Sequence, residues 1–300
     1  MPNVNVERAK QLVRASALAY ENDENAVKGS KHFAGSKLID NPHLKKLTNG
    51  IDSVLIGQTD FGVVVAFRGT LPPTETDPVK AIKVALDWLN DVDLVLRDGP
   101  YSAGKVHDGF RKSLDNLWDN GHLFALVQAA AEGGRRVFFT GHSKGGALAA
   151  LAARRFKAAG VTPAGVITFG APRVGDEKFA STYAVEVPNH WRFEHQDDVV
   201  PHLPPWPAVM LALQALAQFV DLSALLKAKV TKPFGHYQSV GKLCFLDWSN
   251  QLDESDSILL EFKREGRLII AGKELITDHF IDATHLSAGK LGYVETVDLI

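Results

Sequence analysis

Apolar residues along this chain alternate between two spacings, one typical of strands and one typical of helices. Short runs rich in β-branched and aromatic residues predict strands over residues 53–56, 61–67, 137–140, 165–169, 191–194 and 240–246. Longer runs of helix formers predict helices over residues 4–20, 114–131, 147–153 and 177–184. Strands that alternate with helices favour an α/β fold with a mostly parallel central sheet and helices on both faces.

Two apolar segments interrupt this alternation. Over residues 78–90 the apolar side chains recur at helical spacing, with charged and polar residues between them, which predicts an amphipathic helix. Residues 209–220, within a longer segment at about 206–230, are apolar except for Gln214 and Gln218. This second run is too short to span a membrane, and we expect it to be helical.

Length and composition describe an ordinary globular chain. Its 300 residues, 45% hydrophobic and 23% charged, can bury one core, so we expect a single domain over residues 1–300. A formal net charge of −2 leaves no electrostatic footprint for nucleic acid. Cys244 is the one cysteine, so no intramolecular disulfide can form. We see no signal peptide or transmembrane segment, and expect a cytoplasmic or leaderless secreted protein.

The segment Gly141-His142-Ser143-Lys144-Gly145 carries the clearest candidate chemistry. It joins a predicted strand to a predicted helix, and this context makes G-x-S-x-G a nucleophile elbow. Glycines on both sides let the backbone take a strained turn that exposes the Ser143 hydroxyl. The alternative is that these glycines merely close a turn between a strand and a helix.

Four further segments resemble the class 3 lipases, the family that includes the fungal triacylglycerol lipases. They are residues 67–70, His107 with Gly109-Phe110, residues 168–176, and residues 192–205. The resemblance implies an α/β-hydrolase fold and hydrolysis of carboxylic esters, with a lipid or other ester as substrate and transient contact with a lipid interface. It implies no metal and no organic cofactor, and the sequence shows no cluster of His, Cys and carboxylate ligands.

The resemblance also gives the two interrupting segments a place. Residues 71–90 stand where the family carries the lid over its active site, although a surface helix fixed on the core would show the same pattern. In compact family members the chain passes more directly from the segment that matches residues 192–205, which carries the catalytic acid, to the last strands. Residues 206–230 are therefore an insertion. This insertion is either a buried core helix or a helix that lines an acyl pocket or touches lipid.

Activation of Ser143 requires a histidine base and a carboxylate that orients it. By register with the family's Asp-x-Val-Pro pattern the acid is Asp198 and not Asp197, unless both merely cap a loop. For the base, residues 278–282 and 285–287 resemble family segments, and we prefer His279 to His285 and to the early His236. Residues 259–262 and 268–270, with a turn at Gly266, read as a closing hairpin before this loop.

The remaining motif residues have supporting roles. An oxyanion hole is expected from the backbone N–H of Lys144 and, by resemblance, from the backbone N–H and hydroxyl of Thr70. The family most often has Leu where this chain has Lys144. We expect His142 to pack, and His107 and His195 to form structural hydrogen bonds.

Two other functions stay open at this point. An esterase for soluble or aromatic esters can use the same elbow and sheet, because one fold hosts many activities. A catalytically silent lipid-binding or scaffold protein is the alternative outside enzymes.

Overall fold

The computed structural model describes residues 4–70, 95–99, 101, 103–204, 237–268, 278–286 and 290–300. The predicted lid at residues 71–90 and the inserted segment at residues 206–230 lie outside the described residues.

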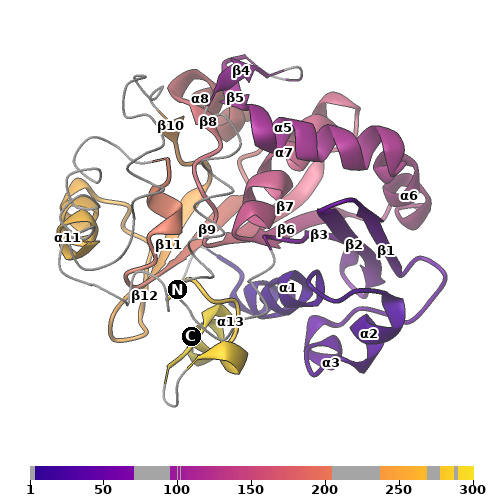
Figure 1. The fold of residues 1–300 in the computed structure, drawn as a ribbon, viewed down its shortest axis with the longest axis horizontal. Coiled ribbons are helices and arrows are strands. Elements are labelled where there is room, and N and C mark those ends of the chain that lie inside the picture. Colours follow the sequence, from indigo (N-terminus) through magenta and orange to yellow (C-terminus); the bar gives the residue numbers. More distant parts are fainter. Residues whose placement is uncertain are drawn as a thin grey trace.

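Two sheets and two groups of helices make up the described chain (Figure 1). The strands are β1 Lys45–Asn49, β2 Asp52–Thr59, β3 Gly62–Phe67, β4 Leu96–Asp98, β5 Lys105–His107, β6 Val137–His142, β7 Pro163–Phe169, β8 Gly175–Asp176, β9 His190–His195, β10 Tyr237–Gln238, β11 Lys242–Leu246 and β12 Leu252–Asp253. The α-helices are α1 Val6–Leu18, α2 Glu24–Gly29, α3 Phe33–Ser36, α5 Asp108–Asp115, α6 Leu123–Ala130, α7 Lys144–Ala158, α8 Glu177–Glu186, α11 Ile258–Leu268 and α13 Tyr293–Leu299. A π-helix spans Asn116–Asn120, and 3-10 turns span Val200–His202 and Ala283–His285.

The large sheet has the order β1-β2-β3-β6-β7-β9-β11-β12. Its centre, from β3 to β11, is parallel, and its two edges are antiparallel. The order β10-β8-β5-β4 forms a small antiparallel sheet beside it. The predicted mostly parallel sheet is therefore confirmed, and each of the six predicted strands lies in or overlaps one of its strands.

Helices cover both faces of the large sheet, and the side chains of each strand alternate between the two. On β3, Val63, Val65 and Phe67 face the core that contains α5, α6 and α7, while Val64 and Ala66 face α1 and α13. This period of two is what a strand buried on both faces requires. Figure 1 shows α5, α6 and α7 on one side of the sheet and α1 and α13 on the other.

Two predicted elements differ in the structure. The helix predicted over residues 114–131 is divided into α5, the π-helix and α6. The division falls at Gly121-His122, where His122 takes a left-handed φ of 55°. Gly121 also packs so closely on Leu47 that a Cβ would lie 2.6 Å from Leu47 Cδ2. The helix is therefore interrupted at Gly121-His122, where the backbone packs against β1.

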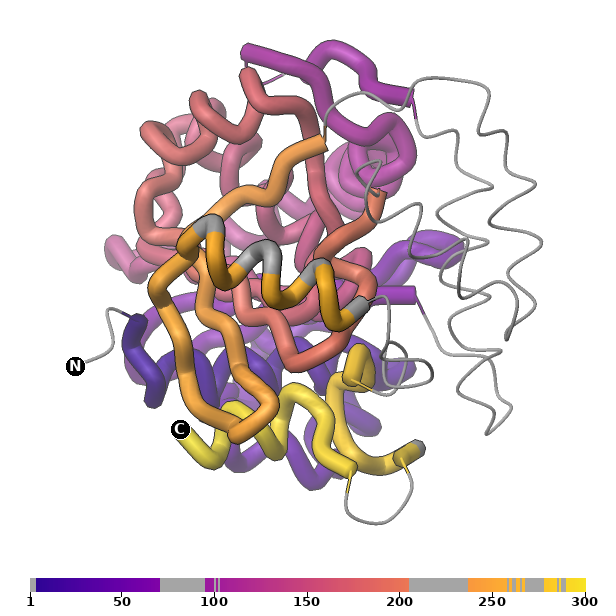
Figure 2. The backbone as a smooth tube through the Cα atoms, turned by 90° about the vertical axis from the view of Figure 1, so that its left-hand side faces the viewer, coloured from indigo at the N-terminus to yellow at the C-terminus, as the bar shows by residue number. Residues whose placement is uncertain are grey.

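The predicted closing hairpin was wrong, because residues 258–268 form helix α11. Leu260 and Arg264, one helical turn apart, are both buried against the sheet. Leu260 packs with Leu243 and Phe245 of β11, and Arg264 forms an ion pair with Glu194 of β9. Gly266 lies inside the helix and not at a turn. Figure 2 shows α11, in orange, crossing in front of the strands in this view.

The topology places the candidate residues together at the edge of the sheet formed by the carboxyl ends of its parallel strands. Gly69, Ser143, Gly170 and Asp198 each follow the carboxyl end of a parallel strand, β3, β6, β7 and β9 respectively. In open α/β sheets this edge is where ligands bind.

Candidate active site

Ser143 stands at a strained turn between β6 and α7. Its φ of 57° and ψ of −134° lie outside the regions that a residue with a side chain normally adopts. Two backbone hydrogen bonds hold the turn, from Ser143 N–H to Phe169 O at 2.9 Å and from Gly146 N–H to Ser143 O at 2.9 Å. Strain held by the surrounding structure is typical of a nucleophile elbow.

The glycines of the motif allow the strand and the helix to meet. A Cβ on Gly141 would collide with the Gly145 backbone, and a Cβ on Gly145 would collide with the Phe67 backbone on β3. The pattern G-x-S-x-G is thus a steric requirement of this turn.

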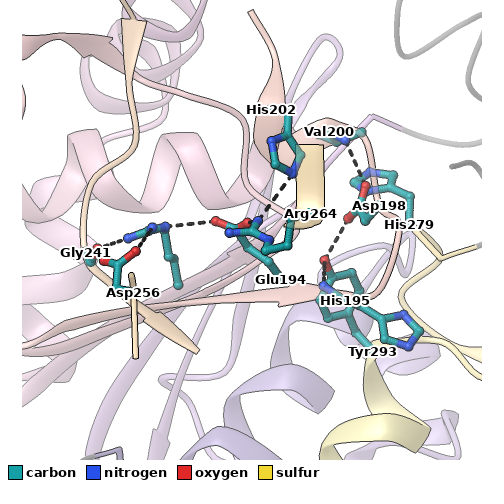
Figure 3. Close-up of polar contacts among 11 residues, drawn as sticks. Glu194, His195, Asp198, Val200, His202, Gly241, Asp256, Arg264, His279 and Tyr293 are labelled. Carbon is teal, nitrogen blue, oxygen red and sulfur yellow. Dashed lines mark hydrogen bonds and ion pairs between the residues drawn. The ribbon is translucent and has the colours of Figure 1, made fainter. Parts of the chain in front are cut away.

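Asp198 and His279 form a buried pair next to the elbow (Figure 3). His279 Nδ1 lies 3.0 Å from Asp198 Oδ1 and 2.9 Å from Oδ2. The Asp198 carboxylate also accepts hydrogen bonds from the Tyr293 hydroxyl at 2.7 Å and from the Val200 N–H at 2.9 Å. Each oxygen therefore has a donor besides the imidazole, and the carboxylate is held as an acceptor for the His279 Nδ1–H.

The other ring nitrogen of His279 is open to a reaction. His279 Nε2 is buried and has no hydrogen-bond partner within the described part of the chain. With Nδ1–H donated to Asp198, Nε2 carries the lone pair that a general base needs. His285 lies in the 3-10 turn that follows, Ala283–His285.

Gly170 connects the pair with the elbow. The residue before it, Phe169, accepts the Ser143 N–H, and Gly170 itself has a φ of +56°. A Cβ here would lie 2.8 Å from Asp198 Oδ2 and 3.0 Å from His279 Nδ1. The end of β7 therefore passes between the serine turn and the His–Asp pair with no room for a side chain.

The predicted oxyanion residues flank the same turn. Lys144 is the first residue of α7, and N–H groups in the first turn of a helix have no acceptor within the helix itself. Thr70 follows Gly69, at which a Cβ would lie 3.1 Å from Ser143 Cβ. Both residues are placed beside Ser143, and their role as donors stays a prediction.

The Lys144 side chain points into the protein. Its ammonium lies 2.6 Å from Asp52 Oδ1, and both side chains are buried. Burial lowers the pKa of Lys144 below its ordinary value, although Asp52 acts in the opposite direction. Where family members most often carry Leu, this chain therefore has a buried ion pair with the start of β2.

The other motif histidines form hydrogen bonds within the protein, although His107 Nε2 is buried without a partner among the described residues. His107 caps α5, since its Nδ1 accepts from the N–H groups of Gly109 and Phe110. His142 bonds Tyr20 and His279, and His195 bonds Asp278 and Thr296. The structural hydrogen bonds predicted for His107 and His195 are present.

Three partners of the site carried no sequence signal that pointed to them: Tyr20, Asp52 and Tyr293. Each reaches the site from a distant part of the chain, through contacts that no local pattern records.

A polar cavity of about 270 Å³ lies behind the loop that carries Asp198. Most of its charged side chains form ion pairs: Arg192 lies 2.8 Å from Glu194 and 3.2 Å from Asp256. Arg264 forms an ion pair with Glu194 (Figure 3). The cavity is therefore unsuited to an apolar chain.

Within the described residues, no helix is long and apolar enough to cross a membrane. The same part of the chain contains no group of three or more His, Cys, Asp or Glu side chains arranged to hold a metal ion. The compartment stays a prediction.

Comparison with known proteins agrees with this geometry. Residues 64–208 match the family model of the class 3 lipases. The chain is 32% identical to the secreted mono- and diacylglycerol lipase 1 of Fusarium solani over 158 residues, which is 52% of this chain and 46% of that protein. It is 34% identical to a lipase of Rhizomucor miehei over 154 residues, 50% of this chain and 39% of that protein. The chain spans less than half the length of these curated relatives.

Solved structures show the same fold. The Rhizomucor miehei lipase propeptide complex superposes with a TM-score of 0.60 over 92% of this chain and 79% of that one, at 20% identity. A triacylglycerol lipase whose catalytic centre is a serine protease triad gives 0.59 over 85% and 89%, at 22% identity. The chain therefore has the α/β-hydrolase fold of these lipases, and its residues 64–208 are similar to the class 3 lipase family.

Proposed function

We propose that the protein hydrolyses carboxylic esters of lipids, as a triacylglycerol lipase, through a triad of Ser143, Asp198 and His279. One observation carries this proposal. A serine held at a strained strand-to-helix turn lies next to a buried His–Asp pair whose outer nitrogen, His279 Nε2, has no partner among the described residues.

The first half of the reaction forms an acyl-enzyme. Ser143 Oγ attacks the ester carbonyl, and His279 Nε2 takes the hydroxyl proton. Asp198 stabilises the imidazolium that results. The tetrahedral oxyanion accepts hydrogen bonds from the Lys144 N–H and from Thr70, and each such donor contributes about 10²–10³ in rate. The imidazolium then protonates the leaving alcohol, and acyl-Ser143 remains.

The second half releases the acid. His279 Nε2 removes a proton from water, the hydroxyl attacks the acyl carbonyl, and the same donors stabilise the second oxyanion. Collapse of this intermediate returns the proton to Ser143 Oγ and frees the carboxylic acid. The atoms balance as ester plus water giving alcohol plus acid, and the cycle needs no metal or cofactor.

The substrate class rests on the family. The curated relatives are named lipases: one is the mono- and diacylglycerol lipase 1 of Fusarium solani, and another is a lipase of Rhizomucor miehei. The chain shares the motif region of this family. We therefore propose esters with long apolar acyl chains as substrates, bound at the carboxyl edge of the sheet.

The proposal is tested by labelling with a fluorophosphonate probe and by hydrolysis of p-nitrophenyl esters of increasing chain length. We expect labelling at Ser143, and a loss of about 10⁴–10⁶ in kcat in Ser143→Ala. Rates that increase with chain length support a lipase, whereas a maximum at acetyl or aromatic esters contradicts the lipid class. Absence of labelling would mean a catalytically silent protein.

A further inference from the structure

The base reaches the site on a loop, residues 278–286, that must be fixed relative to two other strands. A general base tolerates little displacement, because a shift of about 1 Å can cost about 10²-fold in rate. The contacts that fix the first residues of this loop therefore matter to the reaction.

Two consecutive carbonyls of the loop accept hydrogen bonds from two buried histidines. The His195 Nδ1 lies 3.0 Å from the Asp278 carbonyl, and the His142 Nε2 lies 2.6 Å from the His279 carbonyl. A carbonyl can only accept, so each imidazole nitrogen donates. The peptide units on both sides of the His279 Cα are thus anchored by side chains.

Each anchoring histidine belongs to a strand that carries another member of the triad. His142 is the last residue of β6 and directly precedes Ser143. His195 is the last residue of β9 and stands three residues before Asp198. The base loop is therefore attached to the nucleophile strand through His142 and to the acid strand through His195.

Each imidazole donates toward the loop and has a second polar partner at its other nitrogen. The Tyr20 hydroxyl donates to His142 Nδ1 at 2.8 Å, which leaves Nε2 as the donor of that ring. On His195 the donor is Nδ1, because it faces the Asp278 carbonyl, and the Thr296 hydroxyl lies 3.2 Å from Nε2 while it donates to the Gly292 carbonyl at 2.9 Å. Burial lowers the pKa of His142 to about 3 and the pKa of His195 below its ordinary value, so both rings are neutral. A neutral imidazole has one donor and one acceptor, and here the donor faces the loop.

Packing adds to the hydrogen bonds. The rings of His142 and His279 lie with centroids 4.6 Å apart at 31°. His195 also lies 5.4 Å from the ring of Tyr293, whose hydroxyl donates to Asp198. Figure 3 shows His195 and Tyr293 close to the Asp198–His279 pair.

We propose that His142 and His195 are positioning residues, which hold the backbone of His279 so that its imidazole lies between Ser143 and Asp198. They touch neither substrate nor the reacting atoms, and this role rests on the function proposed above. It differs from the packing and structural roles that the sequence predicted for them, because it links their hydrogen bonds to the reaction.

The test compares variants with and without the donor. His142→Leu and His195→Leu remove the donors, whereas His142→Gln and His195→Asn keep an N–H on a side chain of similar reach. The matched control is His190→Leu, since His190 is equally buried and neutral but bonds Thr168 and Tyr183. For each variant we would measure kcat and KM on p-nitrophenyl butyrate, the pH profile of kcat/KM, and the melting temperature.

Each Leu variant is expected to lose about 10²-fold in kcat with little change in KM. The pH at which kcat/KM changes should differ from that of the parent. The Gln or Asn variant should recover most of the parent's kcat. His190→Leu should lower the melting temperature while the folded enzyme keeps its kcat and profile. Folded Leu variants with the parent's kcat and profile would overturn the proposal.

Two milder variants decide the matter if a Leu variant does not fold. Tyr20→Phe and Thr296→Val remove the second partner of each imidazole and should lower kcat with a shifted profile, whereas unchanged values overturn the proposal. Failure of the proposed function looks different. A parent protein without phosphonate labelling at Ser143 overturns both proposals, while a labelled, active parent with unaffected variants overturns this one alone.

Discussion

Replacing Asp52 with asparagine removes the carboxylate that pairs with the buried Lys144 ammonium. Lys144 and Asp52 are 4% and 6% exposed, and their charged atoms lie 2.6 Å apart. At that separation the attraction is about 6 kcal/mol at an effective dielectric constant of about 20. Desolvation of both groups offsets much of this, and removing one partner of such a pair costs about 3–5 kcal/mol.

Urea unfolding measures this change in the free energy of unfolding. For a slope of about 3 kcal/mol per molar urea, a loss of 3–5 kcal/mol lowers the midpoint by about 1–1.7 M. The loss should shrink as the pH rises toward the ordinary lysine pKa of 10.5, because the pKa of Lys144 is lowered in the folded state. The unfolded chain then binds more protons, so stability increases with pH in that window. Without Asp52, which raises this pKa, the increase should be larger than in the parent.

The double variant Lys144→Leu with Asp52→Asn is the matched control. It removes both charges, so we expect its stability to return to within about 1–2 kcal/mol of the parent. Its kcat should persist, because the proposed oxyanion donor is the backbone N–H of residue 144. Single variants that each cost less than about 1 kcal/mol would refute the reasoning, because an exposed pair behaves in that way.

Two further predictions concern the base and its loop. Gly170→Ala places a Cβ 2.8 Å from Asp198 Oδ2 and 3.0 Å from His279 Nδ1, at a φ of +56°. The kcat should therefore fall by about 10²-fold without a matching rise in KM. An unchanged kcat would contradict this, because it would show that Asp198 and His279 can move to make room for the Cβ. Burial raises the pKa of Asp278 to about 6, above the 3.8 of an exposed aspartate, so the folded state binds the extra proton and Asp278 contributes less stability as the pH rises from about 4 to 6. Asp278→Asn should remove this part of the pH dependence in unfolding curves, and identical slopes in both proteins would contradict it.

Features with a local cause were predictable from the sequence. The turn at Ser143 needs glycines at Gly141 and Gly145 because the strand and helix backbones touch there, so the motif itself records the geometry. The strands of the parallel centre are buried on both faces and read as continuous apolar runs. These signals lie within a few residues of the features that they predict.

Features that depend on distant contacts were not predictable. Tyr20, Asp52 and Tyr293 reach the site from elements far away in the chain, and nothing beside them in sequence points to it. Helix α11 was missed because a charged residue, Arg264, occupies a buried position of its inner face and pairs with Glu194. A charged residue at a buried position interrupts the apolar periodicity by which a helix is recognised in a sequence.

The assignment of the triad is tested most directly by comparing His279→Ala with His285→Ala in hydrolysis of a short-chain p-nitrophenyl ester. Both variants should first be shown to be folded, by their melting temperatures. We predict that His279→Ala loses about 10⁴–10⁶ in kcat, as expected when one member of a catalytic unit is removed, while His285→Ala stays close to the parent. A loss of that size in His285→Ala, with His279→Ala nearly unaffected, would contradict the account.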